Sequence, residues 1–229
     1  MRTTLQLPER YESTGELDLS KNRSLKWKLN AAALVLMAAL FFIGNQVFSV
    51  FSLLFDSDAE PASIPYILAK LGAILLIAAF YLLIHEKIHA MAMERLSAAK
   101  ASLGFQGTTA YASSRAYFSK RDHRIVLLAP AFFLTLLITL LTLILPVDWF
   151  WVGLSALILN LAGSVTDFYA AWRVGREPYN VLVLDSGSSQ TYFAPVKTAA
   201  ATVPVQRKRV VSEAKQKQME RIYGKKRKK

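Results

Sequence analysis

Four long apolar runs constrain the fold of this chain more than any other feature. The spans that they predict cover about residues 29–55, 64–93, 125–145 and 149–172. A helix needs about 20 apolar residues to cross the hydrocarbon core of a bilayer, so each run is long enough. The chain is 53% hydrophobic and yet carries a net charge of +12. Because the apolar and basic residues form separate blocks, we predict an all-α integral membrane protein with four transmembrane helices.

The distribution of Lys and Arg predicts the orientation of these spans. The connections 56–63 and 146–148 carry no Lys or Arg, whereas segments 1–28, 95–124 and 173–229 carry most of them. The positive-inside rule therefore places both termini on the cytoplasmic side of the cell membrane. The first span starts too late and is too long for a cleaved signal peptide, so we expect it to be retained.

The chain thus divides into a cytoplasmic N-terminal segment (1–28), a membrane core (29–172) and a cytoplasmic C-terminal region (173–229). Alternating residues in 101–118 and in 181–193 predict two small β-hairpins on the cytoplasmic side. Lys70, near the start of the second span, is expected to reach outward to water. Pro130 is expected in the first turns of the third span, where proline costs least.

The C-terminal region ends in a basic tail, residues 206–229. Such tails are usually solvated and determine topology. A tail tethered beside the cytoplasmic leaflet meets anionic lipid first, so anionic lipid is its expected partner and nucleic acid is the less favoured alternative.

The chemistry is predicted by His85-Glu86-Lys87-Ile88-His89 at the end of the second span. On a helix, residues four apart share a face, so His85 and His89 can bind one metal ion together. Glu86 is then near enough to accept a proton from a water at the metal, and this spacing is typical of zinc metalloproteases. The chain has no cysteine, which excludes thiolate ligands. Nitrogen and carboxylate ligands also accept iron, cobalt or manganese.

A catalytic zinc site normally has a third protein ligand, and Asp167 is the preferred candidate. His85 and Asp167 lie roughly 31 and 27 Å of helix from the outer ends of their spans, and thus at similar depth. Asn160, Gly163, Ser164 and Asp167 also form one polar, small-residue stripe that aims Asp167 inward. His123, just before the third span, is the second choice.

With these residues in place, the chain resembles the site-2 protease type of membrane metalloprotease. More closely, it resembles the small bacterial membrane proteins classed as putative zincin peptidases. The stretches that carry the resemblance are Leu83–Ala90 and Asn160–Asp167. In that family a His-Glu-x-x-His on one span pairs with an Asp on a later span, which implies that His85, His89 and Asp167 bind zinc.

These residues suggest a mechanism in which Glu86 acts as general base and passes its proton to the leaving amine. Asn160 either polarises the substrate carbonyl or forms a hydrogen bond between helices. The expected substrate is a membrane-anchored protein, and soluble or peripheral substrates are a variant of this reading. The 101–118 hairpin either offers a strand edge to an unwound substrate or only covers the site. The alternative function is a catalytically silent adaptor or pseudoprotease, which would not need an intact Glu86.

Overall fold

The computed structural model describes residues 2–55, 60–106 and 109–196. The compact unit Met1–Pro195 contains the helices and strands. The predicted basic tail, residues 206–229, lies outside the described residues. Within the described part, four helical segments are long and apolar enough to cross a membrane: Arg23–Val47, Ile64–Ser97, Lys120–Ile144 and Val147–Gly175.

The first of these helices, α1 (Arg23–Val47), starts and ends earlier than the predicted span. The side chain of Asn22 accepts a hydrogen bond from a main-chain N–H of the first turn, which caps the helix. At the other end, Asn45 Oδ1 accepts a hydrogen bond of 2.8 Å from the N–H of Val50. The chain then continues in a short 3₁₀ helix, η1 (Val50–Leu54), and not in the α-helix that was predicted up to residue 55.

The second and third helices extend beyond the predicted spans. Helix α2 (Ile64–Ser97) ends where Ala98 adopts a left-handed conformation with φ of 55°. Helix α3 (Lys120–Ile144) starts at a cap that Ser119 provides with its hydroxyl group. Because α3 starts before residue 125, Pro130 lies in the helix interior and not in its first turns.

The predicted fourth span is divided in two. A 3₁₀ turn, η2 (Val147–Trp149), leads into α4 (Phe150–Gly163), and α5 (Val165–Gly175) follows. Ser164, between α4 and α5, has φ of −82° and ψ of 2°, and its hydroxyl donates a hydrogen bond of 2.7 Å to the main-chain oxygen of Asn160. The polar stripe expected on one continuous helix thus spans a helix boundary.

In the described ranges, six strands accompany the helices. A hairpin forms from β2 (Ala101–Gln106) and β3 (Thr109–Ser114), and a four-stranded antiparallel sheet has the order β1-β6-β5-β4. The strands of this sheet are β1 (Tyr11–Asp18), β4 (Tyr117–Ser119), β5 (Leu182–Asp185) and β6 (Ser189–Pro195). Both predicted hairpins are confirmed. Strand β1 was not predicted, so the all-α description is too narrow: helices dominate, but a sheet unites the N-terminal segment with the predicted C-terminal hairpin.

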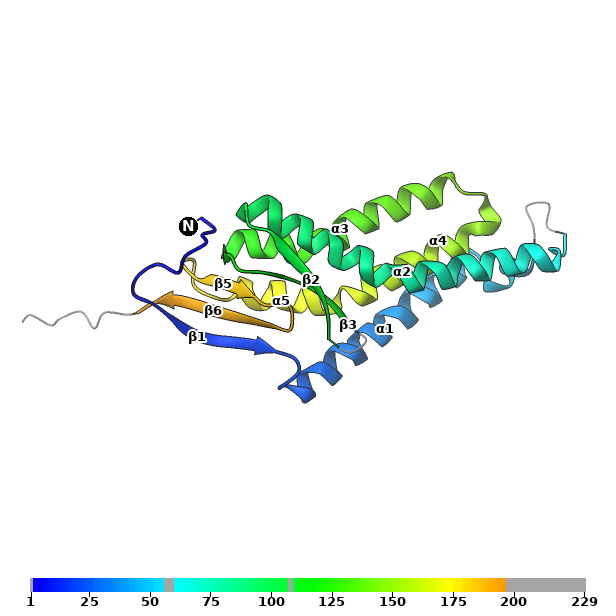
Figure 1. The fold of residues 1–229 in the computed structure, drawn as a ribbon. Helices are drawn as coiled ribbons and strands as arrows, with labels where there is room; N and C mark the ends of the chain where they lie inside the picture. Colours follow the sequence, from blue (N-terminus) through cyan, green and yellow to red (C-terminus); the bar gives the residue numbers. More distant parts are fainter. Residues whose placement is uncertain (1, 56–59, 107–108, 197–229) are drawn as a thin grey trace, which may run out of the picture. The chain divides into compact units, whose positions relative to one another are not determined.

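The strands lie together at one end of the helices (Figure 1). The other end holds η1, η2 and the start of α2. Segments that are distant in sequence are joined at the strand end, where Thr4 bridges Tyr117 and β1 pairs with β6. The segments rich in Lys and Arg within the described part therefore gather at one end of the helices.

Apolar side chains on the helices face outward to an unusual degree for a chain of this size. In the most apolar 18-residue stretch of each helix, only 11% of the residues of α1 and 6% of those of α2 are buried. Lys70 does the opposite of what was expected: it is fully buried, and its Nζ lies 3.1 Å from Asp148 Oδ2 and 2.7 Å from the main-chain oxygen of Phe55. The outward reach predicted for Lys70 is therefore wrong, because an acidic partner on the adjoining η2 turn neutralises it locally.

Candidate metal centre

Helix α2 brings two imidazole rings together one turn apart. Both His85 and His89 are buried, at 4% and 6% exposure, and their Nε2 atoms are 3.2 Å apart. The i, i+4 spacing explains this closeness, since side chains four residues apart lie one above the other on a helix. Two ring nitrogens thus face the same point, as the sequence predicted.

Asp167 joins them from the first turn of α5. Its Oδ2 lies 3.0 Å from His85 Nε2, and its Oδ1 lies 3.6 Å from His89 Nε2. One ligand atom from each of the three residues can be chosen so that all lie within 4.8 Å of one another. The structure therefore brings together the three residues that the sequence proposed as metal ligands.

The spacing of these atoms fits a zinc ion. Two ligands of a tetrahedral ion lie about 3.3–3.4 Å apart when each is about 2.0–2.1 Å from the metal. The separation of 3.2 Å between the two Nε2 atoms and that of 3.0 Å between His85 Nε2 and Asp167 Oδ2 are close to that value. Three protein ligands leave one of four positions for water or substrate, which is the composition of a catalytic site and not of a structural one.

Hydrogen bonds on the far side of each ring fix which nitrogen is available. His89 Nδ1 lies 2.9 Å from the main-chain oxygen of Val126, which can only accept, so Nδ1 carries the proton and Nε2 has a free lone pair. His85 Nδ1 lies 2.9 Å from the hydroxyl of Tyr81, and that hydroxyl lies 3.3 Å from the main-chain oxygen of Asn160. If Tyr81 donates to Asn160, its oxygen accepts from His85 Nδ1, and the second Nε2 is free as well.

Glu86 is held beside this cluster by the β2–β3 hairpin. Its Oε2 accepts a hydrogen bond of 2.8 Å from the N–H of Ala112 on β3. Ala112 stands opposite Leu103, and its N–H points away from β2, so the bond to Glu86 uses a group that the hairpin itself leaves free. The base predicted from the sequence is thus fixed by a strand from another part of the chain.

The cluster opens into a cavity of about 580 Å³. Helices α2 and α5 form one side of it, and β3, the turn between β5 and β6 and the start of α1 form the others. Polar groups beyond the three ligands also line it, among them Glu86, Asp185 and Gln190. The cavity is therefore large enough for a short peptide segment to approach the metal position.

Asn160 does not reach this cavity. It is fully buried, and its Nδ2 donates hydrogen bonds to Ala131 O at 3.3 Å and to Thr135 Oγ1 at 3.0 Å on α3. The geometry supports the alternative of a hydrogen bond between helices and not the catalytic role. The carbonyl polarisation considered for Asn160 has no support here, because the amide faces away from the three ligands.

His123, the second choice for a metal ligand, belongs to a neighbouring cluster. It is fully buried, and its Nε2 lies 3.7 Å from Asp185 Oδ2, at the end of β5. Burial raises the pKa of Asp185, while the charge of His123 acts against that shift. Within the described residues, the three-residue group able to hold a metal is the one formed with Asp167 and does not include His123.

Two residues at the cavity were missed by sequence reasoning. Tyr81 lies one turn before His85 on the same face of α2, so the i, i+4 rule that selected the histidines would also have selected it. Asp185 is brought to the cavity by the pairing of β5 with β6 and β4, and a local pattern carries no signal for such a long-range placement.

The chain was compared with curated proteins, with solved structures and with the models of protein families. Neither the curated proteins nor the solved structures gave a match. The model of one protein family, described as putative zincin peptidase, matches residues 78–182. The matched segment includes His85, Glu86, His89 and Asp167, and it ends before Asp185. Over residues 78–182, the chain therefore matches the putative zincin peptidase family that its motifs resemble.

Proposed function

We propose that this chain is a membrane-embedded zinc metallopeptidase that hydrolyses peptide bonds of membrane or membrane-proximal proteins near the cytoplasmic face. The observation that carries the proposal is the convergence of two imidazole Nε2 atoms and one carboxylate beside Glu86 in a single cavity. The family description, which suggests a metallopeptidase, supports the same reaction class.

The outward-facing apolar surface supports a membrane location. In the part of the chain that the structure describes, four helical segments have the required length and hydropathy, and their apolar faces are largely uncovered by protein. Monomeric soluble proteins rarely expose contiguous apolar patches beyond a few hundred Å². The end with the strands also carries the basic segments, so the positive-inside rule puts the cavity near the cytoplasmic side.

In this mechanism, His85, His89 and Asp167 would hold the zinc ion. When bound, zinc supplies Lewis-acid activation of water and of the substrate carbonyl. Glu86 accepts the proton of the attacking water and delivers it to the amine nitrogen as the peptide bond breaks. The N–H of Ala112 fixes the carboxylate of Glu86 before substrate binds, which reduces the reorganisation needed for proton transfer.

The β2–β3 hairpin has a part in substrate binding under this proposal. The main-chain groups of Ala110 and Ser114 and the carbonyl group of Ala112 point to the side away from β2, and Ala110 and Ala112 line the cavity. An extended substrate segment can pair with groups of this kind, as in other strand-addition complexes. The hairpin would thus both hold the base and present an edge to the substrate.

Metal content is the first test of the proposal. The purified protein is expected to contain about one zinc per chain, measured by plasma mass spectrometry after dialysis. Asp167→Asn and His85→Ala should each lose most of it, while Asp18→Asn, an acidic residue of β1, should not. A wild-type chain that binds no divalent metal would contradict the proposal.

Hydrolysis is tested with a pair of matched glutamates on α2. Both Glu86 and Glu94 accept a hydrogen bond from a main-chain N–H of the hairpin region. Glu86→Gln should keep zinc and lower cleavage of a peptide library by about 10²–10⁴-fold, whereas Glu94→Gln should cleave normally. Full activity of Glu86→Gln would exclude it as the base. Zinc binding by a wild-type chain that cleaves nothing would instead favour the adaptor or pseudoprotease.

The membrane orientation can be tested directly because the chain has no cysteine. Single substitutions Arg115→Cys, beside the hairpin, and Ser63→Cys, before α2, place one thiol at each end of the helices. In intact cells, an impermeant maleimide should label the variant at residue 63 and not the variant at residue 115. The reverse pattern would invert the orientation and put the cavity on the outer side.

A further inference from the structure

We propose that the outer face of α3 binds an anionic phospholipid, with its phosphate at Arg121 and Arg124 and one acyl chain along the apolar residues below them. This inference goes beyond the peptidase activity and rests only on the proposed membrane insertion. Its basis is a second hollow of about 750 Å³ that lies on α3 and is also lined by Tyr179.

The upper end of this hollow is basic. Arg121 and Arg124 lie three residues apart on one face of α3, and both side chains are exposed. Among residues 2–55, 60–106 and 109–196, neither arginine forms an ion pair with a carboxylate. Asp122, between them in sequence, accepts a hydrogen bond of 2.6 Å from Thr3 instead. Two guanidinium groups are therefore available to an external anion.

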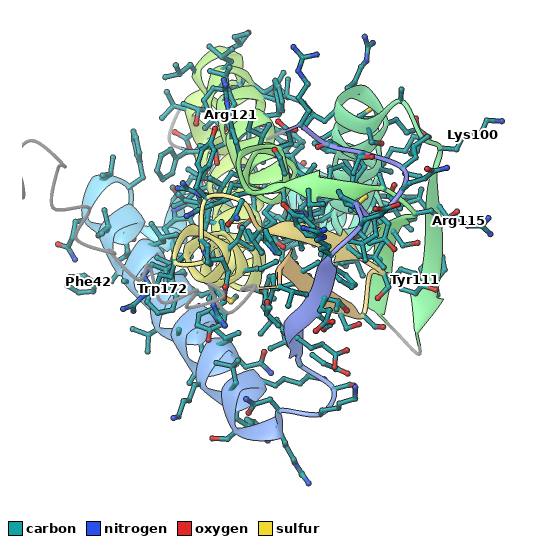
Figure 2. All side chains as sticks on the ribbon, turned by 90° about the vertical axis from the view of Figure 1, so that its left-hand side faces the viewer. Phe42, Lys100, Tyr111, Arg115, Arg121 and Trp172 are labelled. Atoms are coloured by element: carbon teal, nitrogen blue, oxygen red, sulfur yellow. The ribbon has the colours of Figure 1, made fainter. Side chains whose placement is uncertain are left out.

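Lys120 adds a third positive charge at the basic end, but its ammonium group already has a hydrogen-bond partner. Its Nζ donates a hydrogen bond of 2.6 Å to the main-chain oxygen of Glu177, so the ammonium group is tied to the segment after α5. A neutral carbonyl does not cancel its charge, and the field of Lys120 adds to that of the two arginines. Figure 2 shows Arg121 over α3, apart from Lys100 and Arg115 near the β2–β3 hairpin, so the basic residues form separate groups.

The lower part of the hollow is apolar. Its floor continues along the same helix face through Ile125, Leu128 and Phe132, and the next residue, Phe133, also lines it. Phe132 and Phe133 are 65% and 58% exposed, and their rings meet edge to face with centroids 5.5 Å apart. Exposed aromatic rings of this size gain most when a hydrocarbon chain covers them.

The distance between the two parts matches one leaflet. Nine residues separate Arg124 from Phe133, which corresponds to about 14 Å of helix. Half of the hydrocarbon core of a bilayer is about 15 Å thick. With the strand end at the membrane surface, the arginines lie at headgroup depth and the phenylalanines lie near the ends of the acyl chains.

Charge at only one end selects the ligand class. A free anion would use the arginines but would leave the phenylalanines uncovered, and a zwitterionic lipid would place its own cation beside them. A phosphodiester with a single net negative charge and an acyl chain satisfies both parts. The hollow shares no lining residue with the cavity at the metal centre and includes neither Val126 nor Pro130, so it is separate from the metal centre.

The test uses the full-length protein in neutral detergent with phosphatidylglycerol as the probe. Bound lipid is counted by native mass spectrometry during titration. Each arginine near an anionic surface contributes about 1 kcal/mol, or about fivefold in affinity, so Arg121→Gln with Arg124→Gln should weaken binding about 25-fold. The matched control is Lys100→Gln with Arg115→Gln, which removes the same charge elsewhere and should leave binding unchanged.

Other probes separate the possible ligands. Phosphatidylcholine should bind at least tenfold more weakly than phosphatidylglycerol, and millimolar inorganic phosphate should not displace the lipid. Phe132→Ala with Phe133→Ala should weaken binding of the lipid severalfold. Three results would each overturn the proposal. They are equal lipid binding by the double arginine variant and its double control, equal binding of the two lipids, and full displacement of the lipid by phosphate.

Failure of this proposal can be told apart from failure of the peptidase. Zinc content and cleavage should be unchanged in the arginine variants, because the hollow does not contain the ligands. Loss of the wild-type protein from vesicles on carbonate extraction would show that it is not inserted. That result would overturn the lipid site and the membrane location of the peptidase, whereas zinc content and cleavage test the peptidase chemistry separately.

Discussion

His89 Nδ1 donates a hydrogen bond of 2.9 Å to the main-chain oxygen of Val126, a carbonyl that the helix itself leaves unused. In an α-helix this oxygen would accept from the N–H four residues later, but that residue is Pro130, which has no N–H. The proline inside α3 thus frees an acceptor that orients the ring of His89, one of the candidate metal ligands on α2. Ligand orientation by such an outer hydrogen bond typically changes metal affinity 10–100-fold.

Tyr81 should be as important for the other ring. Tyr81→Phe removes the oxygen that lies 2.9 Å from His85 Nδ1, so the ring loses its fixed orientation. We expect zinc affinity to fall by about 10–100-fold, measured by competition with a chelator. Tyr179→Phe, at a residue that is 80% exposed, is the control and should bind zinc as the wild type does. Equal affinity in both variants would exclude the positioning role of Tyr81.

Gly163 is predicted to matter because it makes room for Tyr81. A Cβ at Gly163 would lie 2.5 Å from the Tyr81 hydroxyl oxygen and 3.0 Å from Cζ, which forces the ring to move. Gly163→Ala should therefore lower zinc affinity in the same way as Tyr81→Phe, by about 10-fold or more. Gly72→Ala on α2 is a close control, since a Cβ there meets no atom within 4 Å. It should bind zinc normally, and a loss of affinity there as well would point to a general effect of alanine.

The three candidate metal ligands could be predicted from sequence because local rules place them together. The i, i+4 spacing put His85 and His89 on one face, and helix length put Asp167 at their depth. Those rules depend on helix geometry, which holds whatever the rest of the fold does. Tyr81 follows from the same spacing and was available to the same reasoning.

The remaining features depend on contacts between distant segments. Strand β1 has few apolar residues, and its pairing with β6 joins residues that are more than 170 positions apart. The charge of Lys70 suggested a position in water, but its partner Asp148 lies on η2, the turn that follows α3. The break at Ser164 is set by its own bond to Asn160 O, which a stripe of small residues does not reveal. The composition of the chain and the spacing of its apolar residues do not indicate such long-range pairings.

The buried pair Lys70–Asp148 yields a stability prediction. Lys70 is fully buried and Asp148 is 6% exposed, so removal of one partner leaves the other charged and uncompensated. Lys70→Met or Asp148→Asn alone should each destabilise the protein by about 3–5 kcal/mol. The double substitution Lys70→Met with Asp148→Leu should cost less than either single one. Thermal unfolding in detergent would measure this, and additive losses in the double variant would show that the pair is not coupled.

Asp185 predicts a pH dependence. Its pKa is raised in the folded protein, chiefly by burial, so the folded state holds the proton more tightly than the unfolded state does. The contribution of Asp185 to the free energy of unfolding is therefore largest below a pH of about 4, the pKa of an Asp in the unfolded chain. It falls as the pH rises toward the higher pKa of Asp185 in the folded protein. Asp185→Asn removes this pH-dependent loss of stability, and the Asn side chain can still accept a hydrogen bond from the N–H of Gly187. The variant should gain stability over the wild type as pH increases from 4 to 7, and a constant difference in unfolding temperature would contradict the shift.

Pro130→Ala should separate helix stability from metal binding. The substitution restores an N–H four residues after Val126, which strengthens α3 by up to about 3 kcal/mol. The same N–H competes with His89 Nδ1 for one carbonyl, so zinc affinity should fall by about three- to tenfold, less than after complete loss of an outer bond. Thermal unfolding of the metal-free protein and chelator competition measure the two effects, with Pro146→Ala, before η2, as the control for proline removal. Higher stability together with lower zinc affinity is expected only if Pro130 keeps the carbonyl of Val126 available to His89. A variant that is more stable and binds zinc as tightly as the wild type would show that the carbonyl serves both donors, and that the proline does not contribute to the metal centre.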